Sequence, residues 1–166
     1  MRVFIPATFD MLESLRDNGE LTPLRGWAFA VTPALREFFT EGDEDELADV
    51  AFTDAARASL RLLTDGGGRF PHRRVVVAAD VDDSVANADP EMGDDVVAIT
   101  GSVAMADIAA VHVDLEQAET LVEKAIPLVD AADMGDEDAE LTVGDALEIE
   151  LAWYAPGELS MLVELL

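Results

Sequence analysis

The chain has no cysteine, a single lysine, few aromatic residues and no long apolar run. The absence of cysteine excludes disulfides, thiol nucleophiles and zinc–thiolate sites, and it is compatible with a reducing compartment. No apolar stretch approaches the roughly 18 residues that span a membrane, and residues 1–10 lack the apolar core of a signal peptide. We therefore expect a cytoplasmic protein.

Positive charge is also scarce, because ten lysines and arginines stand against 36 aspartates and glutamates in 166 residues, for a formal charge of −26. Proteins bind nucleic acids and anionic membranes largely through lysine and arginine, so this balance argues against both partners. Half of the residues are nevertheless hydrophobic, unlike those of disordered acidic tails. The composition predicts a folded, soluble protein.

Three explanations of the acidity remain open. One lysine beside nine arginines and many alanines is typical of a genome rich in G and C, and we favour this explanation. The others are adaptation to high salt and mimicry of a nucleic acid by a surface covered with carboxylates. Net charge bears on solubility and association and says little about the fold.

Apolar runs alternate with helix-patterned stretches, and no Pro-, Gly- or Ser-rich linker divides the chain. This order is typical of a single α/β domain over residues 1–166, with a mixed sheet of about six strands covered by helices. We expect strands at about residues 2–6, 27–31, 73–81, 96–103, 110–114 and 147–154.

Capping residues mark the helix starts. Thr8 precedes the first helix, Thr32 stands before a proline at the start of the second, and Asp43 and Glu46 have the spacing of a capping box. The longest helix should follow Asp43 and end at residues 66–68, three consecutive glycines. Its predicted inner stripe is Leu47, Ala51, Ala55, Ala58 and Leu62.

Asp114 and Gln117 repeat the capping-box spacing after a predicted strand. We therefore expect the Asp114 carboxylate to accept a hydrogen bond from the backbone N–H of Glu116 or Gln117 and to start a helix toward Ala132. Pro127 should kink or split that helix, since proline lacks the N–H that a helix interior needs.

Several segments together carry a resemblance to a known family. They are Phe29–Glu37, Asp54–Leu63, Arg73–Val81, Ala109–Asp114 and Gly135–Ala139. With these residues the chain resembles a family of short acidic actinobacterial proteins known only as a domain of unknown function. The resemblance spans nearly the whole chain and implies a single domain. It carries over no catalytic residue, because the family has none assigned.

A group of carboxylates beside a histidine is the first candidate for chemistry. Asp80 and Asp82 lie at the end of one predicted strand, while His112 and Asp114 lie at the end of another. Residues two apart in a strand share a face, and Asp with His suits a divalent metal with bound water. If the strands are parallel neighbours, these residues form a metal site. The simpler interpretation makes Asp82 a turn residue, Asp114 a helix cap and His112 a core histidine.

A basic segment is the second candidate, since Arg69, His72, Arg73 and Arg74 follow the three glycines and could bind an anion. The segment is not a phosphate-binding P-loop, which requires Gly-Lys-Ser/Thr at the start of a helix. The interpretation that we favour pairs these side chains with the protein's own surplus carboxylates.

Two further groups have structural explanations. Residues 133–140 are acidic enough to suggest calcium but lack the ligand order of an EF-hand, so charge at a helix start is favoured. Trp27, Trp153 and Tyr154 lie in apolar, strand-like contexts, which predict core packing.

Because the sequence carries no serine-hydrolase, zinc-protease or dinucleotide motif, we expect a small acidic cytoplasmic binding or regulatory protein without intrinsic catalysis or a cofactor. Its partner should be another protein, and its oligomeric state stays open. One alternative is a divalent-metal-dependent hydrolase that uses Asp80, Asp82, His112 and Asp114. Another is an acidic partner of a basic protein or a nucleic-acid mimic.

Overall fold

The computed structural model describes residues 1–64 and 70–165. Within these residues one sheet has the strand order β5-β6-β3-β1-β4-β8-β9, and β2 pairs with β7 apart from it. The strands of the sheet are β1 (Arg2–Ala7), β3 (Trp27–Phe29), β4 (Val75–Asp80), β5 (Ala86–Ala88), β6 (Val96–Ile99), β8 (Ile108–Val113) and β9 (Ala152–Tyr154), and the separate pair is β2 (Glu20–Leu21) with β7 (Val103–Ala104).

The predicted α/β class is confirmed, but the direction of the strands differs from the expected mixed sheet. Across the described residues every neighbouring pair of strands is antiparallel. Short elements that were not predicted, such as β2 and β5, lie between the longer strands and reverse the chain additional times. A strand-then-helix order in the sequence therefore did not determine strand direction.

The three N-caps predicted for the early helices are confirmed. Thr8 Oγ1 accepts from the Met11 N–H at 3.4 Å, Thr32 Oγ1 from the Leu35 N–H at 3.2 Å, and Asp43 Oδ1 from the Glu46 N–H at 2.9 Å. Each cap satisfies a backbone donor that the first helical turn leaves unpaired. The helices are α1 (Phe9–Asn18), α2 (Pro33–Phe38), α3 (Glu44–Thr64), α4 (Glu119–Ala125), α5 (Val129–Asp133), α6 (Glu137–Leu147) and α7 (Leu159–Glu164).

The helix predicted to run toward Ala132 is divided, as Pro127 predicted. A 3₁₀ turn, Ile126–Leu128, separates α4 from α5 and contains Pro127. The proline lies at the start of this turn, where its missing N–H costs no helical hydrogen bond.

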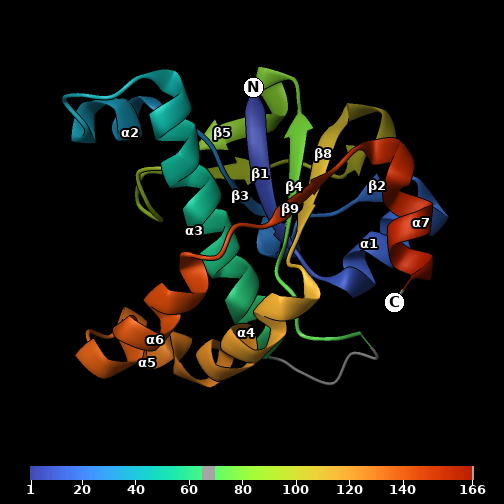
Figure 1. The fold of residues 1–166 in the computed structure, drawn as a ribbon. Helices are drawn as coiled ribbons and strands as arrows, with labels where there is room; N and C mark the ends of the chain where they lie inside the picture. Colours follow the sequence, from blue (N-terminus) through green and yellow to red (C-terminus); the bar gives the residue numbers. More distant parts are fainter. Residues whose placement is uncertain (65–69, 166) are drawn as a thin grey trace.

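Helices cover both faces of the central strands, because these strands are apolar on both sides. Alternate residues of β1, β4 and β8 pack with α1 and α7 on one face, whereas the residues between them pack with α3 on the other. A further apolar cluster joins α4, α5 and α6 to Leu60 near the end of α3. Figure 1 shows these three helices together at that end of α3, away from α1 and α7.

The buried side of α3 is broader than the predicted stripe. Ala58 and Leu62 are only half-buried, and Ala56, Ser59 and Leu60 are buried instead. The reason is that α3 contacts the sheet and the α4–α6 helices at once, so two sides of it are covered. The predicted end of this helix at residues 66–68 lies outside the described residues. None of the described helices is long and apolar enough to cross a lipid bilayer.

Candidate functional site

Asp80, the last residue of β4, and Asp82, which follows the strand, are each hydrogen-bonded to a neighbouring residue. Asp80 is exposed and receives hydrogen bonds from Arg2 Nε at 2.6 Å and Arg2 Nη2 at 3.0 Å, which lower the pKa of its carboxyl group. Asp82 Oδ1 accepts from the Ser84 N–H at 2.9 Å, and this bond lowers the pKa of Asp82. Both side chains therefore have structural roles at this end of the sheet.

The predicted metal ligands do not converge, because β4 and β8 are adjacent but antiparallel. Val75 pairs with Val113 and Ala79 with Ile108, so Asp80 and Asp114 lie at opposite ends of the paired strands. Asp114 lies opposite Arg74, six residues from Asp80, and at about 3.3 Å per residue this separation is roughly 20 Å. In the part of the chain that the structure describes, no three His, Asp or Glu side chains are placed to hold a metal ion.

Asp114 does not cap a helix, and this prediction is wrong. Its buried carboxylate accepts from the backbone N–H and from Nε and Nη2 of Arg74, each at 2.8 Å. The 3₁₀ turn that follows starts at Glu116 and has no side-chain cap. An unpaired guanidinium in the protein interior costs more free energy than a helix start without a cap that water can solvate. The Asp114 carboxylate therefore pairs with Arg74.

The predicted anion-binding cluster is occupied by the protein's own carboxylates. Arg73 Nε lies 2.7 Å from a Glu119 oxygen, and His72 Nδ1 lies 3.9 Å from a Glu123 oxygen. Arg74 is held by Asp114, while Arg69 lies outside the described residues. The positive charge of the described part of this cluster is therefore compensated within the protein, in line with the favoured interpretation.

A groove of about 470 Å³ lies beside Arg74, on the face of the sheet that α3 covers. We call it the α3–β9 groove. This volume falls within the range of small-ligand sites, which is about 300–1,000 Å³. Its lining comes from α3, the residue before β4, β8, and the end of α6 with the segment that leads to β9. The lining residues are Asp49, Phe52, Thr53, Ala56, Arg74, His112, Leu147, Glu148, Ile149, Glu150 and Leu151.

The walls of the groove combine polar and apolar side chains, and its carboxylates stand at exposed positions, which we call its rim. Phe52 and Ile149 are half-buried in its walls, whereas Asp49, Glu148 and Glu150 are exposed. Arg74 contributes no free charge, since Asp114 pairs with it and its Nη2 also donates to the Ile149 carbonyl at 2.9 Å. The net field at the mouth of the groove therefore favours a cation.

His112 supplies a polar group inside the groove. Its ring contacts Phe52 edge to face, with centroids 4.8 Å apart. Burial, with a smaller effect from the charge of Arg2, lowers the pKa of the imidazole, so the ring is neutral at physiological pH. Among the described residues it has no hydrogen-bond partner, which leaves its ring nitrogens available to a bound group.

Trp153 lies beside the groove and is not a core residue, so that prediction is wrong. It pairs with His112 in the β8–β9 register and so projects from the same face of the sheet. Trp153 is 60% exposed, and β9 is the edge strand of the sheet. A local apolar sequence could not reveal which strand would lie at the edge.

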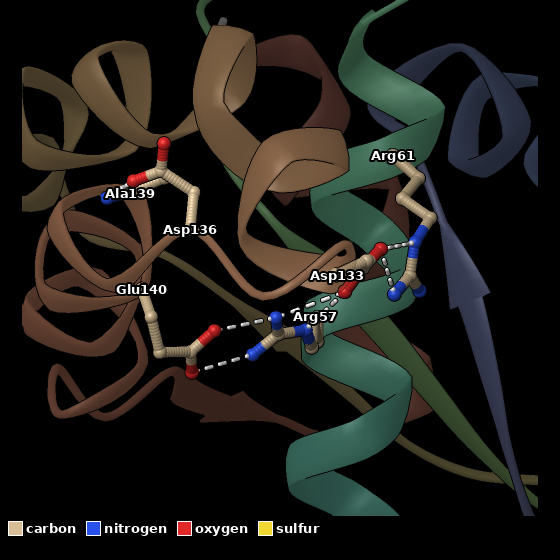
Figure 2. A network of polar contacts seen from close by, with 6 residues as sticks. All are labelled: Arg57, Arg61, Asp133, Asp136, Ala139 and Glu140. Carbon is tan, nitrogen blue, oxygen red and sulfur yellow. Dashed lines mark hydrogen bonds and ion pairs between the residues drawn. The ribbon is translucent and has the colours of Figure 1, made fainter.

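The acidic stretch near Asp133 holds helices together, as Figure 2 shows. Arg57 on α3 donates to Asp133 at 2.9 Å and to Glu140 at 2.9 Å, and Arg61 donates to Asp133 at 2.6 Å. Burial opposes the charge on Asp133, but the bonds from Arg61 and Arg57 outweigh it and lower its pKa. Asp136 caps α6 through the Ala139 N–H, which agrees with charge at a helix start.

The rim residues Glu148 and Glu150 were missed by the sequence interpretation. They lie in a segment predicted as strand, whereas the chain there leaves α6 and reaches β9 only at Ala152. Charged and apolar residues alternate in this segment. That pattern is compatible with the wall of a groove as well as with a strand, so it did not identify Glu148 and Glu150 as groove residues.

The α3–β9 groove thus places carboxylates and apolar side chains next to each other. The candidate metal ligands Asp80, Asp82, His112 and Asp114 are not brought together at one site. Comparison with curated proteins and with solved structures finds no match to the chain. The model of a family of unknown function, DUF6912, matches residues 1–163. The chain therefore belongs to this family of unknown function.

Proposed function

We propose that this is a small acidic binding protein that recognises a basic protein partner in the cytoplasm. The observation that supports the proposal is that most of the described arginines are paired with carboxylates of the same chain. Within the described residues, seven arginines form ion pairs with the protein's own carboxylates, and they are Arg2, Arg16, Arg36, Arg57, Arg61, Arg73 and Arg74.

The remaining charge is large and of one sign, because 36 acidic residues exceed the basic residues to leave −26. Such a surface attracts basic partners at long range and raises their rate of association. It repels nucleic acids and anionic membranes for the same reason. The absence of cysteine agrees with a reducing compartment such as the cytoplasm.

Affinity purification from the native cell, followed by mass spectrometry, tests the proposal. We expect a small set of basic proteins that are released when the salt concentration rises, since screening weakens attraction between exposed charges. A bait of equal net charge and unrelated fold is the control and should not retain the same set. Specific retention of neutral or acidic proteins alone would contradict the proposal.

A further inference from the structure

The α3–β9 groove has both carboxylates and apolar side chains in its lining. Its rim carries Asp49, Glu148 and Glu150, and its walls include Phe52 and Ile149. These are the surroundings that suit a long side chain with an aliphatic stem and a cationic head.

We propose that the α3–β9 groove receives a lysine or arginine side chain from an extended basic segment of the partner protein. This inference rests on the proposed function and names the surface that carries it. The charges are complementary, because the rim is acidic and the guanidinium of Arg74 is neutralised by Asp114 at 2.8 Å.

His112 and Trp153 give the bound side chain specific partners. A neutral imidazole accepts a hydrogen bond, and the ring of His112 lines the groove without a hydrogen-bond partner among the described residues. Trp153 is exposed and lies opposite His112 in the β8–β9 pair, and the face of an indole ring attracts a cation. Both groups favour lysine or arginine over an apolar side chain.

Binding of a short fluorescent peptide of alternating lysine and leucine, followed by anisotropy, tests the inference. The charge variant combines Asp49→Asn, Glu148→Gln and Glu150→Gln, and the filling variant is Thr53→Tyr at an exposed position of the lining. The matched control combines Asp107→Asn, Glu37→Gln and Glu91→Gln, which removes the same charge from exposed positions outside the groove.

We expect the charge variant to weaken binding about tenfold or more, because it removes three favourable charge contacts, while the control changes it much less. Thr53→Tyr should also weaken binding although it leaves the charge unchanged. If the charge variant and the control weaken binding equally and Thr53→Tyr has no effect, the α3–β9 groove is not the binding site. That result would leave the proposed function unaffected. No binding of the peptide by the wild type, together with no basic partner from the cell, would overturn both.

Discussion

Asp95 is a buried carboxyl group that forms no ion pair with any of the described residues. Its side chain belongs to a residue that is 5% exposed, and no donor in the described structure reaches Oδ2. Burial, together with the nearby carboxylates of Asp54 and Asp94, raises the pKa of Asp95 to about 8. At neutral pH the group is therefore mostly protonated.

The folded protein should lose stability as Asp95 ionises. In the unfolded chain an aspartate ionises near pH 4, so the contribution of the neutral group is complete below about pH 4 and is lost as the pH rises toward about 8. The loss is at most about 1.4 kcal/mol per pH unit. We expect Asp95→Asn to be more stable than the wild type at about pH 8 in urea unfolding, with the difference shrinking toward about pH 4.

Glu91→Gln is the control for this prediction, because Glu91 is an exposed carboxylate in the loop before β6. It should leave the pH dependence of the unfolding midpoint close to that of the wild type. A parallel pH dependence of Asp95→Asn and the wild type would show that Asp95 is ionised in the folded protein throughout this range.

At the level of elements, Arg57 joins α3 to the helical pair α5 and α6. It is bound to Asp133 at the end of α5 and to Glu140 on α6, and its side chain is 18% exposed. Since α6 leads directly to Leu147 in the wall of the groove, the same contacts help to position that wall. The contacts of Arg57 with Asp133 and Glu140 thus help to hold one wall of the α3–β9 groove in place.

Arg57→Met should lower the free energy of unfolding by about 1 kcal/mol, because the largely buried guanidinium of Arg57 bonds the carboxylates of Asp133 and Glu140 at once. Thermal or urea unfolding measures the change. Arg36→Met is the control, since Arg36 pairs with Glu44 at the exposed start of α3 and its loss should have little effect. Equal losses in the two variants would show that the Arg57 contacts contribute no more than an exposed ion pair.

The whole molecule carries a charge of −26, which the folded state confines to a small volume. Added monovalent salt should therefore raise the unfolding temperature, because at physiological ionic strength the Debye length falls to about 8 Å and repulsion is screened. A sodium chloride titration followed by circular dichroism measures this. An unchanged or falling midpoint would mean that the carboxylates are already neutralised, whereas a requirement for molar salt would favour adaptation to a saline environment.

Much of the fold followed from local sequence. Thr8, Thr32 and Asp43 were identified as caps, and Pro127 as a break, because capping and helix interruption depend on residues within one turn. The central position of β4 followed from its continuous apolar run. These features depend on the backbone chemistry of a few neighbouring residues, and the sequence by itself determined them.

The candidate site depended on tertiary structure. Asp114 fits the local pattern of a cap, yet it pairs with Arg74, which is forty positions away in the chain. The α3–β9 groove likewise exists because antiparallel pairing places Trp153 beside His112 and leaves β9 at the edge of the sheet. Strand direction and order are decided by how all the apolar faces are buried together, and therefore only the tertiary structure brings these side chains into contact.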